Sequence, residues 1–330
     1  MTNLDLAAMV EMLKAASEAT RLRILAVLCQ GDLTVSDLTR ILSQSQPRVS
    51  RHLKLLQEAG LIIRYQEGAW AYFRLADDQM RMTITHAILN HLNHGDHMLE
   101  SDQHRLNQVK EERNSYAASY FSANAALWDK LRLLHVPDNA VEAAMREIVG
   151  GKTFQSMLDI GTGTGSMLKL FADLYLRGVG VDNNRDMLAI ARSNLDLAGI
   201  TNAQVRQGDI AALPVDKESF DLVTIHQVLH FLDDPQAAIR EAARVMRPNG
   251  RLIIVDFAAH DLEFLRTDYA HLRLGFSDEQ MKTWIDKAGL EFVDSVEFEP
   301  KDRQKGLTVK LWLAKDPRLL MAEKVSALTA

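Results

Sequence analysis

The chain has 330 residues, of which 47% are hydrophobic and 25% charged, and its formal net charge is −6, so its length suits two domains better than one ordinary core. No apolar run approaches the roughly 20 residues of a membrane-spanning helix, and the first residues mix acidic with apolar side chains, unlike a signal peptide. The single cysteine excludes an internal disulfide and favours a reducing compartment, so we expect a cytoplasmic protein without a membrane partner.

The first third of the chain is predicted to be mostly helical. Apolar residues recur at helical spacing over residues 4–28, with a break before Thr20, which is a plausible cap for a second helix. A short helix is expected to start near Thr34. After a polar turn, Pro47 opens another helix that ends at Gly60.

This last helix has two different faces. Val49, Leu53 and Leu56 form an apolar stripe at positions i, i+4 and i+7. The opposite face is polar and basic, and such a face can enter the major groove of DNA. The predicted DNA-binding residues are Gln46, Arg48, Ser50, Arg51, His52 and Lys54.

Two strand-like segments, LIIRYQ and WAYFRL, follow around a turn at Gly68 and predict a two-stranded wing. Residues 1–75 carry nine Lys or Arg against seven Asp or Glu, so this region is slightly basic in an acidic chain. A helix-turn-helix followed by a wing in this order indicates a DNA-binding domain.

Three segments, ATRLRILAVL, VSDLTRILSQSQPRVSRHLKLLQEAGLI and GAWAYFRL, resemble the arsenic-repressor (ArsR) family of winged-helix regulators. The resemblance covers about residues 5–98. It implies a double-stranded DNA operator as partner and a homodimer joined through the first and last helices of the domain.

The metal sites of that family are incomplete here. Thr34-Val35-Ser36 stands where metal-sensing members carry thiols. A second family site would use Asp78, His91 and His94, but Met80 replaces a histidine, and methionine is a poor zinc ligand. We therefore expect no metal and read a polar helix face, although the sequence leaves metal binding by Asp78, His91 and His94 open. Cys29, among apolar neighbours, is expected to be a buried thiol.

A polar segment, residues 95–115, is expected to be a solvated helix or linker. Residues 116–149 regain helical periodicity and are rich in aromatic side chains, which fits either packing onto the next domain or a helical cover over a ligand site. The expected organisation is a winged-helix domain at 1–98, a helical linker and cap at 99–150, a methyltransferase-like domain at 151–316 and a tail at 317–330.

From Met157 onward, strand and helix patterns alternate. The strands are SMLDIG, GVGVD, AQVRQGD, FDLVTIHQV and RLIIVDF, and helical segments such as SMLKLFADLY, DMLAIARSNLDLAG and AAIREAARVM lie between them. This α/β pattern predicts a doubly wound, Rossmann-like parallel sheet whose ligand lies at the carboxyl ends of the strands.

The first of these strands runs into LDIGTGTG, a glycine-rich turn. It lacks the third glycine of a nicotinamide fingerprint and the Lys of a phosphate-binding loop, so the ligand should lack a pyrophosphate. Asp182, 17 residues beyond Gly165, is placed to take both ribose hydroxyls. Asp209, after the third strand, can accept from an adenine amino group.

Five segments in family order, LDIGTGTG, VDNNRDML, RQGDIAALP, SFDLVTIHQVLHFLDDP and REAARVMRPNGRLIIVDF, resemble the class I S-adenosylmethionine-dependent methyltransferases. The resemblance implies S-adenosyl-L-methionine (or S-adenosyl-L-homocysteine) as cofactor and an antiparallel pair of strands at the sheet edge, FVDSVEFEP and LTVKLWLAK. It places Asp159 near the methionine amino group and Asp209 with Ile210 at the adenine. The implied cofactor-binding residues are Asp159, Gly161, Thr162, Gly163, Gly165, Asp182, Asn183, Met187, Gly208, Asp209, Ile210 and His226.

Catalytic residues are less well defined. His226 and His230 are candidate bases, although His230 also fits a packing element of the family. A polar insert at residues 260–273, with two histidines and two arginines, suits an anionic ligand. One cysteine is too few for arsenic methylation, and the Asn-Pro-Pro-Tyr motif of DNA-base methylases is absent.

Two functions fit this pattern. The first is a DNA-binding transcriptional regulator whose C-terminal domain binds S-adenosylmethionine or S-adenosylhomocysteine as effector or methyl donor. The second is an S-adenosylmethionine-dependent small-molecule methyltransferase with an accessory winged-helix domain. No motif identifies the operator sequence, the acceptor of the methyl group, or whether the ligand tightens or releases DNA.

Overall fold

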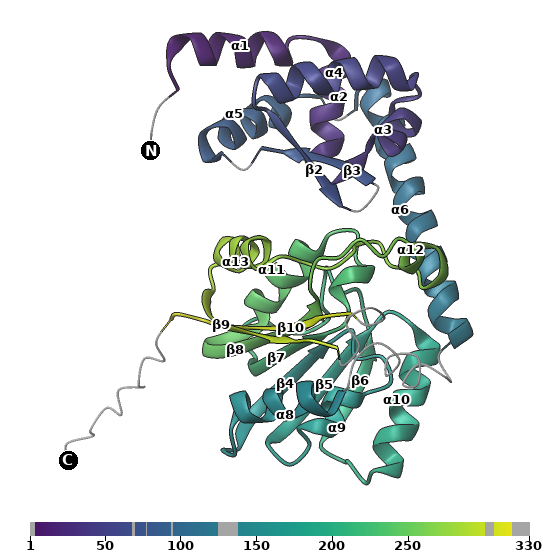
Figure 1. Ribbon diagram of the computed structural model, residues 1–330, viewed down its shortest axis with the longest axis vertical. Coiled ribbons are helices and arrows are strands. Elements are labelled where there is room, and N and C mark those ends of the chain that lie inside the picture. The colour runs from purple at the N-terminus through teal and green to yellow at the C-terminus, as the bar shows by residue number, and fades with distance from the viewer. Residues whose placement is uncertain are drawn as a thin grey trace, which may run out of the picture. The chain divides into compact units, whose positions relative to one another are not determined.

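The computed structural model describes residues 4–67, 70–76, 78–93, 95–124, 138–300 and 307–318 (Figure 1). The chain divides into two compact units, an N-terminal unit that extends to Ala117 and a C-terminal unit that begins at Ala118. Within the described ranges, no helix is both long and apolar enough to cross a membrane.

The N-terminal unit is a winged helix-turn-helix. Strand β3 lies between β1 and β2, and both pairings are antiparallel. The turn expected at Gly68 lies outside the described residues. The elements are α1 (Leu6–Ala16), α2 (Ala19–Leu28), β1 (Leu33–Thr34), α3 (Val35–Leu42), α4 (Gln46–Glu58), β2 (Ile62–Glu67), β3 (Trp70–Leu75) and α5 (Gln79–Asn90).

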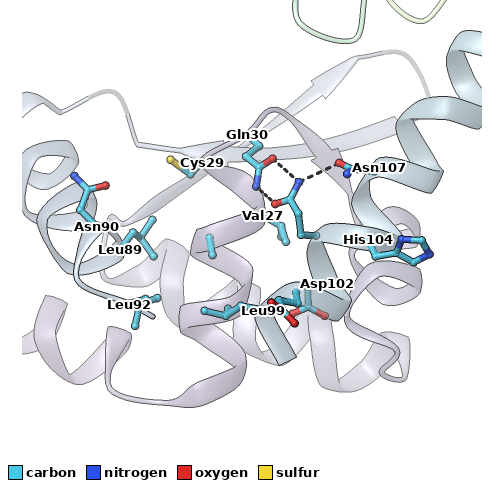
Figure 2. Close-up of a pocket in the computed structure, with 13 residues that line it drawn as sticks. Val27, Cys29, Gln30, Leu89, Asn90, Leu92, Leu99, Asp102, His104 and Asn107 are labelled. Atoms are coloured by element: carbon cyan, nitrogen blue, oxygen red, sulfur yellow. Dashed lines mark hydrogen bonds between the residues drawn. The ribbon is translucent and has the colours of Figure 1, made fainter. Parts of the chain in front are cut away.

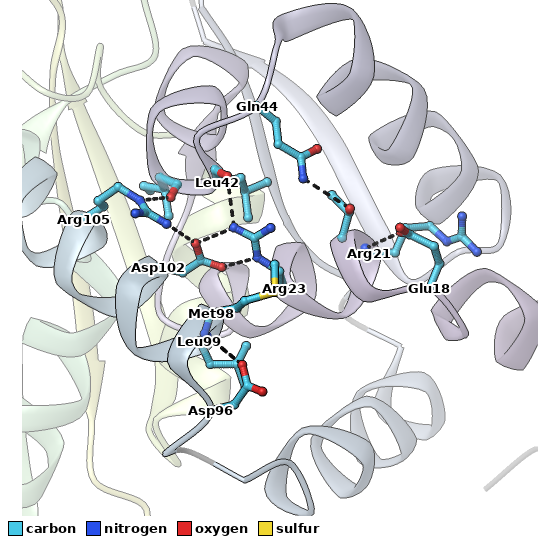
Figure 3. Close-up of polar contacts among 12 residues, drawn as sticks. Glu18, Arg21, Arg23, Leu42, Gln44, Asp96, Met98, Leu99, Asp102 and Arg105 are labelled. Carbon is cyan, nitrogen blue, oxygen red and sulfur yellow. Dashed lines mark hydrogen bonds and ion pairs between the residues drawn. The ribbon is translucent and has the colours of Figure 1, made fainter.

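The predicted helix starts are confirmed at α3 and need correction at α2. Thr34 caps α3 with a reciprocal capping box to Asp37. For α2, Thr20 lies inside the helix and is buried, while Glu18 caps it by accepting a hydrogen bond from the Arg21 N–H (Figure 3). The expectation for Thr20 was wrong because glutamate is a rare N-cap and threonine a common one.

The N-terminal unit continues beyond residue 98, where we expected its domain to end. A single helix, α6, runs from His97 to Asn124. Its first half is part of the N-terminal core, because Leu106 and Val109 are buried there. Asp102 is also buried, and its carboxylate pairs with Arg23 of α2 at 2.5 Å (Figure 3). The segment is thus a helix, one of the two alternatives expected from the sequence, and residues 99–117 belong to this unit.

The C-terminal unit is built on a seven-stranded sheet with the order β6-β5-β4-β7-β8-β10-β9. The first five strands in that order are parallel, and β10 is antiparallel to both β8 and β9. The doubly wound sheet and the antiparallel edge pair are as predicted. The strands are β4 (Phe154–Ile160), β5 (Tyr175–Asp182), β6 (Ala203–Gln207), β7 (Phe220–His226), β8 (Met246–Phe257), β9 (Glu291–Phe298) and β10 (Val309–Lys315).

Helices cover both faces of this sheet (Figure 1). One face packs against α11 (Pro235–Val245) and α13 (Asp278–Lys287), and the other packs against α8 (Asp138–Val149) and α9 (Ser166–Leu170). The remaining helices are α10 (Arg185–Leu197), α12 (Phe264–Asp268) and the 3₁₀ turn η2 (Leu229–Phe231). The fold thus brings the loops after β4, β5, β6 and β7 to one edge of the sheet.

One predicted helix was too long. The segment SMLKLFADLY has helical periodicity, yet α9 ends at Leu170 and β5 already begins at Tyr175. Phe171, Leu174 and Tyr175 are all buried in the same hydrophobic cluster. Burial of these side chains against the sheet overrides the helical preference of the segment.

Candidate functional site

The glycine-rich turn after β4 has a backbone that only glycine adopts easily. Gly161, Gly163 and Gly165 have φ values of 68°, 51° and 85°. At Gly161 a Cβ atom would lie 2.4 Å from Cγ2 of Val228, so a side chain has no room. The turn is also held by the end of β5, because the N–H groups of Gly161 and Thr162 donate to the Val181 carbonyl at 2.8 and 3.0 Å.

The carboxylate of Asp182 lies beside this turn. One of its oxygens accepts a hydrogen bond from the Gly163 N–H at 2.9 Å, and the other accepts from the Asn184 N–H at 2.8 Å. Burial raises the pKa of Asp182 despite these hydrogen bonds. The structure thus brings together the turn and the predicted ribose acid, although their cofactor contacts stay a prediction.

The residues after Asp182 start α10. Asn184 caps this helix by accepting hydrogen bonds from the N–H groups of Asp186 and Met187. The predicted cofactor residue Met187 is buried in the first turn. Asn183 is exposed at the same edge. These positions lie together on the β5–α10 connection.

The predicted adenine residues follow β6. The Gly208 N–H donates to the Asp182 carbonyl at 3.0 Å, which holds this loop against the end of β5. Asp209 is exposed and accepts from the Ala211 N–H at 2.8 Å, whereas Ile210 is buried in the core. Gly208 therefore places this loop next to Asp182, the predicted ribose acid, as the parallel sheet requires.

Asp159 occupies a more enclosed position than its neighbours. It is buried, and its Oδ1 accepts a hydrogen bond from the Thr224 hydroxyl at 2.7 Å. Burial, together with the charge of Asp159, raises the pKa of Tyr175. This carboxylate therefore sits between β4 and β7, directly before the glycine-rich turn.

The two candidate bases differ in their surroundings. His226 is a buried residue at the end of β7. His230, in η2, places its Nδ1 2.7 Å from Oδ1 of Asp256, and both side chains are buried. The sequence interpretation missed Asp256. Its position at the end of the apolar run IIVDF was the only available signal, since a buried acid after such a run requires a partner.

Aromatic rings surround His230. Its ring centroid is 4.0 Å from that of Phe231, 4.9 Å from that of Phe257 and 4.2 Å from that of His271. His230 therefore has the packing role that we considered, and it also has an ordered hydrogen-bond partner. Its catalytic role, like that of His226, stays a prediction.

The polar insert is more buried than expected. His271 and Arg273 are both buried, and Arg273 donates to the Asp233 carbonyl at 2.6 Å. Arg266 donates to the Leu272 carbonyl. Part of the hydrogen-bonding capacity of both arginines therefore holds the fold, and an anionic ligand at this insert stays a prediction.

Within the C-terminal unit, the last turn of α6 contacts one neighbour of the candidate base His230 and one neighbour of the candidate cofactor residues. The Phe121 ring packs edge-on against Phe231, with centroids 4.6 Å apart. The Asn184 amide donates to the Ser122 hydroxyl at 3.2 Å. Part of the helical cover considered from the sequence, including Trp128, lies outside the described residues.

Helix α4 presents the predicted DNA-binding face. Its apolar stripe of Val49, Leu53 and Leu56 is buried, as the sequence predicted. Five of the six predicted residues on the other face are exposed: Gln46, Arg48, Ser50, Arg51 and Lys54.

His52 is the exception on this helix. Its side chain is 13% exposed and its Nδ1 lies 3.5 Å from a Glu18 carboxylate oxygen. Burial lowers the pKa of His52 against the opposing charge of Glu18. The structure therefore separates His52 from the five exposed residues, and its DNA contact stays a prediction.

The candidate metal positions lie at opposite ends of α5. Asp78 caps the start of the helix, His91 follows its end, and His94 lies outside the described residues. In the described part of the chain no group of three or more His, Cys, Asp or Glu side chains is placed to hold a metal. The expectation of a buried Cys29 was wrong, because this residue is exposed and its Sγ lies 3.5 Å from Nδ1 of His86.

Comparison with known families assigns both units. Residues 158–254 match the family model of a methyltransferase domain, and residues 18–64 match that of the bacterial regulatory proteins of the arsR family. The chain thus joins an ArsR-type helix-turn-helix to a methyltransferase domain, as the sequence predicted.

Two curated relatives match the methyltransferase part. The uncharacterized methyltransferase YcgJ of Bacillus subtilis (strain 168) is 34% identical over 116 residues, which are 35% of this chain and 46% of YcgJ. The ubiquinone/menaquinone biosynthesis C-methyltransferase UbiE of Shewanella sp. (strain ANA-3) is 33% identical over 127 residues, which are 37% of this chain and 51% of UbiE. The chain thus spans about half the length of the curated relatives it matches.

Solved structures agree on the fold. A chain from the complex between the Haloferax volcanii Trm112 methyltransferase activator and a methyltransferase aligns with a TM-score of 0.53 and 20% identity. The alignment covers 62% of this chain and 99% of that chain. At this level of identity the likeness concerns the fold alone.

Proposed function

We propose that the chain is a DNA-binding transcriptional regulator whose methyltransferase domain binds S-adenosylmethionine, or S-adenosylhomocysteine, as effector or methyl donor. One observation carries this proposal. The continuous helix α6 begins in the winged-helix core, where Asp102 pairs with Arg23, and its last turn contacts Phe231, beside the candidate base His230, and Asn184, beside candidate cofactor residues. A ligand that changes this last turn acts on a helix that is also part of the DNA-binding unit.

The DNA-binding half of the proposal is supported by the arsR-family match and by the exposed basic face of α4. The proposed partner is a double-stranded operator, with α4 in the major groove and the wing beside it. Fluorescence anisotropy on DNA from upstream of the gene tests this half. Affinity no greater than for an unrelated duplex at the same salt concentration would contradict a regulator of its own gene.

The cofactor half is supported by the methyltransferase-domain match and by the geometry of the turn. The turn supports a closely bound nucleoside, because its glycines let the backbone approach a ligand and the half-buried carboxylate of Asp182 lies next to it, accepting from the Gly163 N–H. When bound, S-adenosylmethionine supplies an electrophilic methyl group on its sulfonium. Calorimetric titration with S-adenosylmethionine, and separately with S-adenosylhomocysteine, tests this half. The absence of a heat of binding with both ligands would contradict the proposed cofactor site.

We further propose a homodimer joined through the first and last helices of the winged-helix domain. Helix α1 supports this, because Leu6, Val10 and Leu13 are 82%, 37% and 47% exposed at the spacing of one helix face. Sedimentation equilibrium tests the proposal, with Leu6→Ser/Leu13→Ser expected to shift the chain towards a monomer. Since a regulator must reach its DNA operator inside the cell, we propose a cytoplasmic location.

A second function, a small-molecule methyltransferase with an accessory winged-helix domain, is favoured by the His230–Asp256 pair. A carboxylate on Nδ1 orients the imidazole and stabilises the charge that it gains when Nε2 takes a proton from an acceptor. The relative UbiE, named as a C-methyltransferase, supports such an activity. Incubation with methyl-labelled S-adenosylmethionine and a small-molecule extract tests it. Label transfer that His230→Gln abolishes without loss of cofactor affinity would establish the methyltransferase activity. Absence of transfer would favour the transcriptional regulator.

A further inference from the structure

A cavity of about 520 Å³ opens in the N-terminal unit between α2, α5 and the first half of α6 (Figure 2). It lies entirely among residues 26–107, so none of its lining belongs to the methyltransferase domain. Its apolar part is formed by Ala26, Val27, Leu89, Leu92 and Leu99. A space of this size, largely apolar with a few placed polar groups, is typical of small-molecule sites.

Primary amides form the polar side of the cavity. Gln30 and Gln103 donate to each other through their side-chain amides, at 2.5 and 2.9 Å, and Gln103 also donates to Asn107 at 3.0 Å (Figure 2). These hydrogen bonds hold the three amides in a row between α2 and α6. The Gln30 amide retains a second N–H, and the amide oxygens retain lone pairs, so the row can still bind a molecule with both donors and acceptors.

The charges around the cavity argue against an anionic ligand. No Lys or Arg occurs among the lining residues. The buried carboxylate of Asp102 is already paired with Arg23 at 2.5 Å and with Arg105 at 2.7 Å (Figure 3). Glu100 is exposed at the rim, where water screens its charge. The cavity therefore offers hydrogen bonds and apolar surface but no free buried charge.

We infer that this cavity is a second ligand site, and that it binds an uncharged, flat molecule with an apolar body and a carbonyl- or amide-bearing edge. The body lies against Val27, Leu89 and Leu99, and the edge bonds to the amide row. S-adenosylmethionine, with its three charged groups, does not fit this description. The site is thus separate from the proposed cofactor site and would respond to a different class of molecule.

The residues that line this cavity between α2 and α6 lie next to the contacts that hold α6 in place. Gln103 is adjacent to Asp102 in the chain, and the Arg23 that pairs with Asp102 also donates to the Leu42 carbonyl at 3.0 Å, at the end of α3. A molecule inserted between α2 and α6 therefore bears on contacts that position the helix-turn-helix.

The single cysteine provides a direct test, because Cys29 lines the cavity and is exposed. The probe is Nile red, an uncharged flat heteroaromatic carbonyl compound. We expect saturable binding of one dye per chain in the full-length protein. We also expect the bound dye to slow the reaction of Cys29 with a disulfide reagent about fivefold or more. This readout uses neither DNA nor S-adenosylmethionine, so its outcome is independent of the proposed function.

Two alanine-to-leucine variants complete the experiment. Ala26→Leu places extra carbon atoms inside the cavity and should weaken dye binding about tenfold or more, with circular dichroism confirming that the variant is folded. Ala143→Leu adds the same side chain to the exposed surface of α8 and should leave dye binding unchanged. The inference is overturned if Nile red does not bind, if it binds without protecting Cys29, or if folded Ala26→Leu binds it as well as the wild-type protein does.

Discussion

The two units of this chain hold their candidate binding residues in opposite ways. On α4, exposed side chains such as Arg48 and Arg51 form the predicted DNA-binding face, and a separate buried stripe anchors the helix. In the methyltransferase domain, the candidate groups are the glycine-rich turn at Gly161, the buried carboxylate of Asp159 and the half-buried carboxylate of Asp182. Binding and packing are thus divided between different residues in the first unit and depend on the same residues in the second.

This difference determines what substitution can do. Exposed side chains on a helix contribute little to stability, so a change there alters recognition alone. A residue in a crowded turn cannot change without moving its neighbours, so a change there alters both ligand binding and folding. The four predictions below follow from this contrast.

The largest expected loss of stability comes from Asp102, a buried position away from both the DNA-binding face and the proposed cofactor site. Asp102→Ala leaves the Arg23 guanidinium buried without its carboxylate, which should lower the free energy of unfolding by about 3–5 kcal/mol. Urea denaturation measures this change. Glu112→Ala, on the same helix, breaks an exposed pair with Arg40 and should leave unfolding nearly unchanged. Equal effects of the two variants would contradict the buried role of Asp102.

Gly161→Ala should affect both the fold and the cofactor site. The left-handed backbone disfavours alanine by about 1–2 kcal/mol, and the collision with Val228 adds about 1–3 kcal/mol. Calorimetry should also show loss of S-adenosylmethionine binding. Gly199→Ala, at φ 67° with no atom within 4 Å of the new Cβ, should show only the backbone cost. A Gly161→Ala variant as stable as Gly199→Ala would contradict the collision between the new Cβ and Val228.

The double change Arg48→Ala/Arg51→Ala should affect DNA binding alone. Each arginine is expected to contribute about 1–3 kcal/mol to operator affinity if it reaches a base edge. The thermal unfolding midpoint should stay within a few degrees of the wild type. Lys152→Ala/Lys217→Ala removes the same charge from exposed positions of the C-terminal unit and serves as the control for net charge. Unchanged DNA affinity in the α4 variant would show that this helix is not the recognition helix.

The smallest expected effect is on the pH dependence of cofactor binding. Ribose hydroxyls donate to an ionised carboxylate, and burial has raised the pKa of Asp182 above the usual range of aspartate. As pH falls from neutral through this raised pKa, Asp182 becomes protonated and affinity for S-adenosylmethionine should fall a few-fold. Calorimetry over a series of falling pH values, down to the lowest at which the protein stays folded, measures it. Asp182→Asn should bind weakly and lose this pH dependence, whereas Asp196→Asn, an exposed control, should retain it. A wild-type affinity with the same pH dependence as that of Asp182→Asn would contradict the ribose role.

Periodicity alone predicted much of the fold. The stripe of Val49, Leu53 and Leu56, the wing, and the alternation of strands and helices after Met157 all follow from local spacing of apolar residues. The glycine-rich turn was found because its backbone needs glycine at successive positions. These features are encoded within short stretches of the chain.

The features that the sequence did not reveal depend on distant residues. Arg23 and Asp102 are 79 positions apart, and His230 and Asp256 are 26 apart, so neither pair follows from local pattern. The early end of α9 reflects burial of Phe171 and Tyr175 against the sheet. Cys29 was expected to be buried because its chain neighbours are apolar, but the end of α2 turns it towards His86 and the cavity.

The central claim is that cofactor binding in one unit changes DNA binding in the other. The most direct test is the operator affinity of the full chain, measured by fluorescence anisotropy at fixed salt with and without saturating S-adenosylmethionine. Coupling of about 1–3 kcal/mol, a change of roughly 5- to 150-fold in either direction, is the predicted result. Identical affinities, with calorimetry showing that the cofactor is bound, would contradict the claim and leave the two domains energetically independent.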